Sequence, residues 1–312
     1  MQALIDVIFP VFLIISFGYA VAWRGPFDEA TVDGVMRFAQ NFAVPCLLFK
    51  SIATLDLSAN LDLGLFASFY LAAFASFGLG YFGARRLFHR PAPDAVAISF
   101  ACLFSNSLLL GLPITERAYG TAALAGNYAI IAIHAPLLLG FGITCMEFTL
   151  SRGQTTSAPA LARQVTRAIL AQPLVLGIIA GFIVNLSTVP MPDILVAAVD
   201  MMARTAIPAA LFALGGVLLR YRPEGDMKTI AMVCAISLVV HPALTWGLGR
   251  FIFGLDIHQM RSAVMTSAMP PGVNAYMFAH LYGVGKRVAA SSVLIATGSA
   301  MITVWVWLHL LP

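Results

Sequence analysis

Two apolar stretches of the chain combine polar side chains with helix-breaking residues. The first contains Ser105-Asn106-Ser107 and then Gly111-Leu112-Pro113, and the second contains Met269-Pro270-Pro271-Gly272-Val273-Asn274. A proline inside a helix removes one backbone hydrogen bond and clashes with the carbonyl one turn earlier. We therefore expect one helix to break within 105–113, with Pro113 as a break residue, and another to break at Pro270, Pro271 and Gly272.

Amide side chains beside such breaks could bind an anion. An amide donates hydrogen bonds to a carboxylate without bringing a charge into apolar surroundings. The hydroxyls of Ser105 and Ser107 could add further donors. The N-terminal ends of broken helices also favour anions. Asn106 is the first candidate, and Asn274, one turn beyond the second break, is the next. The alternative is a structural role, in which Asn106 forms hydrogen bonds with backbone groups left unpaired at the break and Asn274 forms a hydrogen bond with a neighbouring helix.

Three further positions are candidates with open alternatives. Asn41 lies one turn before Pro45 and could line a site or serve packing. Arg204 follows Asp200 by four residues on one helix face, so it could pair there at the membrane interface or recruit an anion. Pro45 and Pro208 are expected to kink their helices, and either could also line the site.

The remaining chemically versatile residues are scattered. His134 and His241 are single histidines in apolar surroundings, where a structural role or a role in proton coupling is open. The four cysteines lie in apolar runs without metal-ligand spacing, and free cysteine behaves as a small apolar residue. We expect no metal and no cofactor.

The elements that hold these residues are predicted to be membrane spans. Hydrophobic residues make up 60% of the 312 residues and charged residues 10%, with a mean hydropathy of +0.89, whereas soluble domains carry about 25% charged residues. Ile5–Trp23 lacks a preceding Lys or Arg and a cleavage pattern, so we interpret it as a span and not a secretory signal. One transmembrane domain (1–312) with ten helices is expected, at about 4–23, 32–53, 63–83, 94–116, 122–148, 166–186, 194–219, 229–252, 258–283 and 288–309.

Basic residues predict the orientation of these spans. Of 18 Lys and Arg residues, most lie in the loops after the odd-numbered spans, and cytoplasmic loops are the ones enriched in basic residues. Both termini should therefore lie on the non-cytoplasmic side. The opposite loops contain only Lys50, Arg117, Arg250 and Arg261.

Proline and glycine positions indicate an internal repeat with an offset of 163 residues. The Ser/Thr/Pro/Gly-rich stretch after residue 150 divides the chain into a first repeat (1–150), a linker (151–163) and a second repeat (164–312). Five spans in each half would give the repeats opposite orientations in the membrane. The matching positions are Pro10 and Pro173, Gly18 and Gly181, Pro45 and Pro208, and Tyr119-Gly120 and Tyr282-Gly283.

Four segments resemble motifs of the auxin efflux carrier family, and the resemblance covers essentially the whole chain. The compact length resembles the bacterial branch of that family, which includes malonate and malate carriers, so a bacterial inner membrane is the expected location. The segments are NFAVPCLLF at 41–49, NSLLLGLP at 106–113, PAALFALG at 208–215 and MPPGVNAYMFA at 269–279.

This resemblance implies a fold and a substrate class. It implies ten helices in two inverted repeats related to bile-acid symporters, with helices four and nine crossing at unwound centres, and a carboxylate substrate. It places Asn106 at the substrate site and Pro270 at the second break, and it makes a homodimer an expectation. Pro271 and Asn274 differ from the plant pattern, which leaves the substrate preference open.

The expected function is therefore secondary active transport of a small organic anion by alternating access. The anion would be a mono- or dicarboxylate such as malonate, malate or an auxin-like acid, and a proton or sodium ion could be coupled to it. A channel or membrane-embedded sensor for a small solute is the alternative. An enzyme is not expected, because nucleophile–base motifs and clustered intramembrane carboxylates are missing from the sequence, and nothing in it suggests nucleic acid as a partner.

Overall fold

The structure is a computed structural model that describes residues 4–57, 61–151, 158–187 and 190–311. Over these ranges the chain is helical, and the single β-bridge recorded joins Ser105 to Pro271. Residues 152–157 of the linker predicted at 151–163 lie outside the described ranges. The helix α9 begins at Ala158, inside that predicted linker.

The first half of the chain contains helices of α and π type and one short 3-10 turn. They are η1 (Leu4–Ile8), α1 (Phe9–Trp23), α2 (Glu29–Phe38), η2 (Ala39–Ala43), α3 (Val44–Ala53), α5 (Leu63–Arg86), α6 (Ala92–Leu103), η3 (Ser107–Gly111), α7 (Leu112–Tyr119), η4 (Thr121–Leu124) and α8 (Ala125–Leu150).

The second half repeats this composition without the 3-10 turn. Its helices are α9 (Ala158–Leu170), α10 (Pro173–Ser187), α11 (Asp193–Leu219), α12 (Met227–Ala235), η5 (Ile236–Val240), α13 (His241–Gly247), η6 (Leu248–Ile252), α14 (Ile257–Ser267), α15 (Val273–Tyr282) and α16 (Lys286–Leu310).

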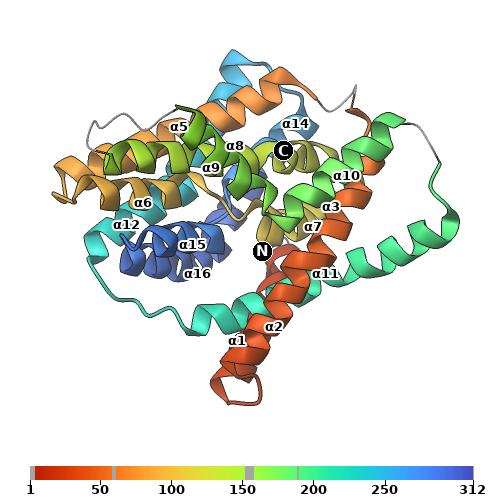
Figure 1. The fold of residues 1–312 in the computed structure, drawn as a ribbon, viewed down its shortest axis with the longest axis horizontal. Coiled ribbons are helices and arrows are strands. Elements are labelled where there is room, and N and C mark those ends of the chain that lie inside the picture. The colour runs from red at the N-terminus through yellow and green to blue at the C-terminus, as the bar shows by residue number, and fades with distance from the viewer. Residues whose placement is uncertain (1–3, 58–60, 152–157, 188–189, 312) are drawn as a thin grey trace.

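These helices pack as two groups. In the first group α1 lies along α11, α3 lies along α10, and α11 also packs on α2 and α3. In the second group α5, α6, α8 and α12 to α16 pack on one another. Figure 1 shows the first group on the right and below, and most of the second group on the left. Where the two groups face each other, a site can form between them.

The chain is a polytopic membrane protein by the length and composition of its helices. Six helical segments in the described part of the chain are long and apolar enough to cross a membrane, and a bent pair makes a seventh. The predicted spans 32–53, 94–116 and 258–283 are each divided into shorter helical pieces. The six segments are Ile5–Trp23, Leu63–Arg86, Thr121–Leu150, Asp193–Leu219, Met227–Ile252 and Lys286–Leu310.

The predicted span 166–186 has a different form in the structure. The bent pair consists of Pro159–Leu170 and Pro173–Ser187, which meet at 82°. Pro173 has no N–H to continue the first helix, and it disfavours helical backbone at Gln172. The apolar span therefore begins at Pro173, and α9 before it is amphipathic.

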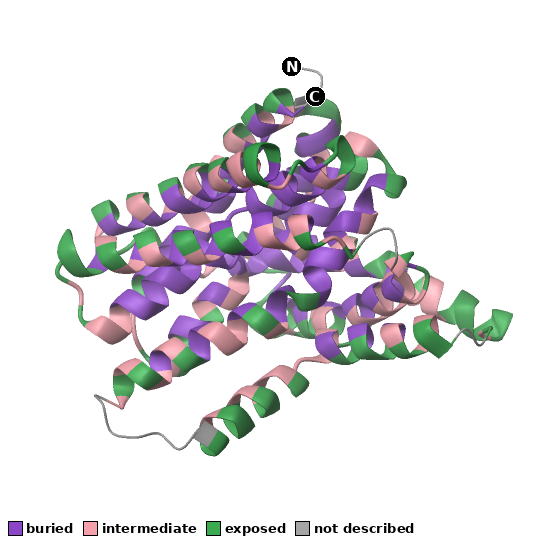
Figure 2. Ribbon diagram, turned by 90° about the horizontal axis from the view of Figure 1, so that it is seen from above, coloured by how far each residue is buried: buried purple, intermediate pink, exposed green. Residues whose placement is uncertain are grey.

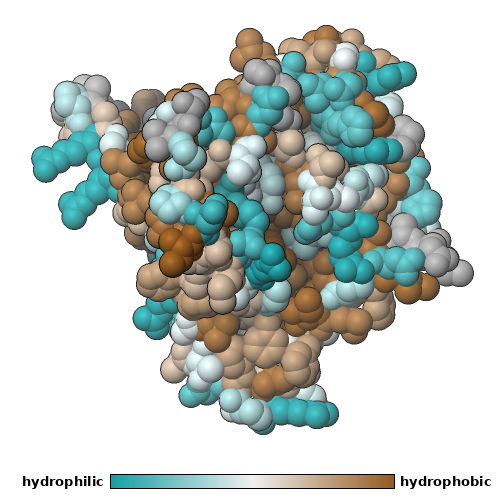
Figure 3. Space-filling view, turned by 90° about the vertical axis from the view of Figure 1, so that its right-hand side faces the viewer, coloured by the Kyte–Doolittle hydropathy of each residue, from teal (hydrophilic) through white to brown (hydrophobic). Residues whose placement is uncertain are grey.

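Many large apolar side chains lie on the outside of the molecule. Buried residues form the centre of the helix layer and exposed residues its periphery (Figure 2). The face in Figure 3 carries broad apolar areas with hydrophilic groups clustered between them. Exposed apolar area of this extent is unusual for a soluble monomer and fits a lipid-facing surface. Examples are Leu63, Phe82, Phe148, Leu176, Ile194 and Phe251.

Prolines explain where several helices widen. Pro10, Pro45, Pro113 and Pro242 each occupy the second position of an α-helix that directly follows a π-helical turn. A wider turn moves the preceding backbone away from the proline ring and accommodates the missing N–H. Pro208 differs, because it lies inside the uninterrupted helix α11.

Two glycines let helices of the first group approach closely. A Cβ built on Gly18 of α1 would lie 1.9 Å from the carbonyl oxygen of Phe212 in α11. A Cβ built on Gly181 of α10 would lie 2.8 Å from the carbonyl oxygen of Phe49 in α3. Neither pair of helices could keep its present separation with a larger residue at these positions.

Candidate functional site

Two helices are interrupted at the same place and bonded to each other there. The chain is extended between α6 and η3, and again between α14 and α15. The Asn106 N–H donates to the Pro270 carbonyl at 2.8 Å, and the Gly272 N–H donates to the Phe104 carbonyl at 3.1 Å. These antiparallel bonds satisfy backbone groups that the interruptions would otherwise leave unpaired in the membrane. We call this pair of interruptions the crossover.

The predicted break residues occupy different places around the crossover. Pro270, Pro271 and Gly272 form the second interruption itself. Pro113 lies further along, in the first turn of α7, and the first interruption falls at Phe104–Asn106.

The polar side chains of the first interruption are buried. Ser105, Asn106 and Ser107 have exposed fractions of 4%, 8% and 2%. The Ser105 and Ser107 hydroxyls lie 2.7 Å apart, and the Ser107 hydroxyl also donates to the Ser105 carbonyl at 3.3 Å. The two hydroxyls are thus engaged with each other, which leaves the Asn106 amide as the polar group best placed to meet a ligand.

A cavity beside the crossover brings the predicted residues together. It encloses about 810 Å³ of empty space, including its open mouth. Asn41 reaches it from η2 and Asn274 from α15, whereas Ser105, Asn106 and Ser107 line it from the first interruption. We call it the crossover cavity. Residues from both helix groups line it, so relative movement of the groups would change its shape.

Sequence reasoning missed two further amides in this cavity. Gln40 lies beside Asn41 in η2, and Gln172 lies at the bend before Pro173. The sequence could have indicated both residues, because Gln40 is next to the candidate Asn41, and Gln172 is next to Pro173, which matches Pro10 in the predicted repeat. The remaining polar side chain in the wall is His134 of α8. Among the described side chains that line the crossover cavity, none is an acid, a lysine or an arginine, and the imidazole of His134 is the one group that could gain a charge near neutral pH.

The backbone adds donors at the same place. Val273 and Asn274 are the first two residues of α15, and the helical turn η3 begins at Ser107. The first N–H groups of a helix lack acceptors within the helix and carry a partial positive charge. Both half-helices therefore present N-terminal ends beside the cavity, where they would favour a negative group.

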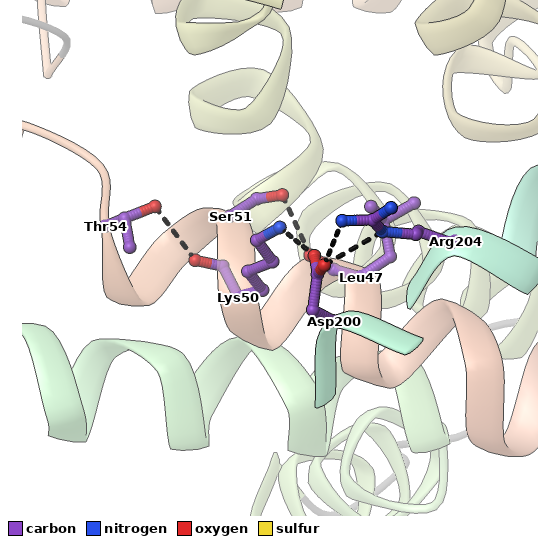
Figure 4. A network of polar contacts seen from close by, with 6 residues as sticks. All are labelled: Leu47, Lys50, Ser51, Thr54, Asp200 and Arg204. Carbon is purple, nitrogen blue, oxygen red and sulfur yellow. Dashed lines mark hydrogen bonds and ion pairs between the residues drawn. The ribbon is translucent and has the colours of Figure 1, made fainter. Parts of the chain in front are cut away.

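Arg204 lies in a second cavity, apart from the amides. This cavity encloses about 1830 Å³, including open space, and its described lining residues differ from those of the crossover cavity. Arg204 pairs with Asp200, with 2.6 Å between Nη2 and Oδ2, and Asp200 also pairs with Lys50 of α3 (Figure 4). The Arg204 side chain is 80% exposed. The pairing of Asp200 with Arg204 agrees with the predicted shared helix face, while the link to Lys50 depends on the fold.

The structure offers no arrangement for a metal ion within its described residues. Groups of three or more His, Cys, Asp or Glu side chains that could hold a metal are not found there. The four cysteines are unpaired, with Cys102 buried and the other three partly buried.

Comparison with known proteins now identifies the family. A family model described as "Membrane transport protein" matches residues 3–308. The chain belongs to the auxin efflux carrier family of membrane transport proteins. The predicted resemblance to this family is thereby confirmed.

Relatives within this family come from bacteria and plants. The chain is 24% identical to "Putative malonate transporter" of Rhizobium meliloti, over 100% of this chain and 97% of that protein. It is 20% identical to "Uncharacterized transporter YfdV" of Escherichia coli, over 96% and 95%. It is also 20% identical to "Auxin efflux carrier component 5" of Arabidopsis thaliana, over 93% and 91%.

Proposed function

We propose that this protein is a secondary active transporter that binds a small carboxylate in the crossover cavity and carries it across a membrane. The observation that carries the proposal is the grouping of Asn41, Asn106 and Asn274 around one cavity at the crossing of two interrupted helices. The membrane transport family and the relative named as a malonate transporter support the same conclusion.

The chemistry of the cavity favours an anion. Amide and hydroxyl groups donate hydrogen bonds to a carboxylate, and the two half-helix ends add backbone donors. The described lining contains no carboxylate that would repel the substrate. A mono- or dicarboxylate such as malonate, malate or an auxin-like acid fits this set of donors.

Closely packed glycines support two inverted repeats of five spans each. Gly18 faces the Phe212 carbonyl, and Gly181 faces the Phe49 carbonyl. Adding 163 to Gly18 and Phe49 gives Gly181 and Phe212, so each contact is the counterpart of the other under the predicted repeat. The C-terminal glycines of α7 and α15, Gly120 and Gly283, correspond in the same way, and both have positive φ. We propose ten spans on this basis, with each interrupted helix counted as one span.

Separate cavities favour a carrier over an open pore. The crossover cavity and the second cavity share no described lining residue. In the proposed cycle, the group containing α1, α3, α10 and α11 moves against the other group and opens the crossover cavity to each side in turn. Arg204, in the second cavity, would meet the anion on its approach from the non-cytoplasmic side.

Location and assembly follow from the same relatives and from charge. We propose a bacterial inner membrane, with both termini on the non-cytoplasmic side because basic residues concentrate in the loops after odd-numbered spans. A homodimer is proposed by analogy with the family.

A binding screen followed by transport tests the function. Purified protein should unfold at a higher temperature with malonate or another small carboxylate, because a ligand of the folded state stabilises it by about 2.7 kcal/mol at a hundredfold excess over Kd. Reconstituted protein should then show saturable uptake that an internal pool of the same anion accelerates. Ionic currents far above the rate of a carrier would instead establish a channel, and a lack of response to all carboxylates would reject the substrate class.

A further inference from the structure

His134 is a buried histidine whose ring nitrogens have no hydrogen-bond partner of good geometry among the described residues. It lies on α8, is 5% exposed, and lines the crossover cavity. Neither Nδ1 nor Nε2 reaches a described partner with hydrogen-bond geometry, although the Ser105 backbone lies nearby. Leaving a buried polar group unpaired destabilises a fold, so a histidine kept in this state needs an explanation.

Aromatic rings hold the imidazole in place. Its centroid lies 4.7 Å from that of Phe104, 5.6 Å from Phe69 and 6.5 Å from Tyr70. Phe104 is also the residue whose carbonyl accepts the crossover hydrogen bond from Gly272. The ring is therefore fixed at the crossover, next to the Ser105 and Asn106 backbone.

Few titratable groups face this ring. His241 of α13 packs on the same phenyl ring of Phe69, at 5.4 Å, and Tyr70 of α5 directs its hydroxyl to the Ile130 carbonyl at 2.7 Å. The other elements that line the cavity (η2, α3, the first interruption, η3, α10, α15 and the Gln172 bend) contribute amide, hydroxyl and apolar groups. An imidazolium in the empty cavity would thus have no described carboxylate to compensate it, and its surroundings are apolar.

We propose that His134 binds one proton when a carboxylate enters the crossover cavity, so that the protein carries the anion and a proton together. This step rests on the proposed function and adds the coupling ion. The carboxylate supplies the missing negative charge, and an imidazole N–H would donate to one of its oxygens. Because binding of two ligands is reciprocal, the carboxylate strengthens proton binding by the same factor by which the proton strengthens carboxylate binding.

The protons and charges balance in this scheme. A proton from water on one side attaches to the lone pair of an imidazole nitrogen as the anion binds, and it returns to water on the other side when the anion leaves. A monocarboxylate would cross with no net charge, and a dicarboxylate dianion would carry one net negative charge.

Proton uptake during binding tests this proposal on the purified full-length protein. Malonate would be added at neutral pH in weak buffer containing a pH indicator, and its affinity would be measured at several pH values. Wild-type protein should take up about one proton for each malonate bound, with an affinity that rises about tenfold for each unit fall in pH. His134→Gln should bind malonate without proton uptake and with little pH dependence.

His241→Gln is the matched control. His241 is equally buried and packs on the same phenyl ring, but it does not line the cavity. This variant should keep the proton uptake of the wild type. Should His134→Gln fail to fold, ¹⁵N shifts of labelled histidine side chains in wild type and His241→Gln should still show one imidazole becoming imidazolium on addition of malonate.

Each other outcome overturns the proposal in a recognisable way. Full proton uptake in His134→Gln would place the proton elsewhere, for example on malonate itself. Malonate binding to wild type without proton uptake would reject the coupling and leave the transporter proposal intact. A wild-type protein that binds no carboxylate would reject both.

Discussion

Asn106 and Asn185 show two different uses of an amide in this fold. Asn185, in α10, donates through Nδ2 to the carbonyls of Ile52, Ala53 and Leu55 at 2.9, 3.2 and 2.8 Å. The first two carbonyls end α3 and the third follows just after it, so Asn185 ties one helix to the end of another. Among the described residues, the side-chain amide of Asn106 has no comparable set of acceptors, and Asn106 lines the crossover cavity instead. One amide ties two helices together, and the other is proposed to bind the ligand.

Replacing each amide should separate affinity from stability. Asn106→Ala should weaken malonate binding at least tenfold while changing the midpoint of thermal unfolding little. Asn185→Ala should lower that midpoint, because it removes the side-chain donor that bonds the carbonyls at and just after the end of α3, at a cost of about 1–3 kcal/mol, and it should leave affinity unchanged. Thermal unfolding with and without malonate measures both quantities. Equal malonate affinity in Asn106→Ala and wild type would remove Asn106 from the site.

Close helix packing depends on glycine at matched positions. Gly18→Ala and Gly181→Ala should each destabilise the protein by about 1–3 kcal/mol, because the added methyl group would meet a backbone carbonyl. Gly78→Ala in α5 is the control, since a Cβ there meets nothing within 4 Å, and removing a helical glycine should stabilise by about 0.5–1 kcal/mol. Thermal unfolding in one detergent compares all three variants, and stable Gly18→Ala protein would contradict the close approach.

Asp226 links the start of α12 to the loop before α6. It accepts hydrogen bonds from the Thr229 hydroxyl at 2.7 Å and the Lys228 N–H at 3.0 Å, and it pairs with Arg90 at 3.2 Å. The Thr229 hydrogen bond, helped by the backbone N–H groups and Arg90, lowers the pKa of Asp226 below its ordinary value of 3.8. The ionised carboxylate therefore stabilises the fold at pH values above the ordinary pKa of 3.8, and this stabilisation is lost as the pH falls through the lowered pKa.

Asp226→Asn should remove this acid-dependent contribution. The variant should be less stable than wild type at neutral pH, and the difference should shrink at a pH below the lowered pKa, where the wild-type carboxyl is also uncharged. Thermal unfolding of both proteins across this pH range measures the difference. A stability difference that does not change with pH would show that the carboxylate charge is not responsible.

The whole molecule presents two cavities between two helix groups. The Lys50–Asp200–Arg204 network lies in the second cavity and joins α3 to α11 within one group. The crossover cavity lies against the interrupted helices of the other group. In the proposed transport cycle, this separation would let the network hold one group together while the crossover cavity changes its exposure.

The proposed topology can be tested on whole cells. In a background without the four native cysteines, Arg250→Cys should react with a membrane-impermeant maleimide added outside, and Arg24→Cys should react only after the membrane is permeabilised. Both side chains are exposed in the structure. In the proposed ten-span arrangement Arg24 follows the first span and Arg250 lies in η6 at the end of the eighth, so the two are on opposite sides of the membrane. Labelling of both positions in intact cells would reject that arrangement.

Local sequence patterns determined the apolar helices, the interruption at Pro270–Gly272 and the amides beside the breaks. Hydropathy and proline act on residues close together along the chain, so these features follow without knowledge of the fold. Pro113 itself does not break its helix, because the π-turn before that proline accommodates it.

Only the tertiary structure decided which distant side chains share a cavity. It placed Asn41, Asn106 and Asn274 around one cavity and paired both Lys50 and Arg204 with Asp200. It also left the ring nitrogens of His134 without a described hydrogen-bond partner of good geometry. Such relations depend on packing between helices far apart in sequence, where a shift of one turn moves a side chain to another surface. Residue types alone therefore indicate what the chemistry could be, and helix packing determines where it can occur.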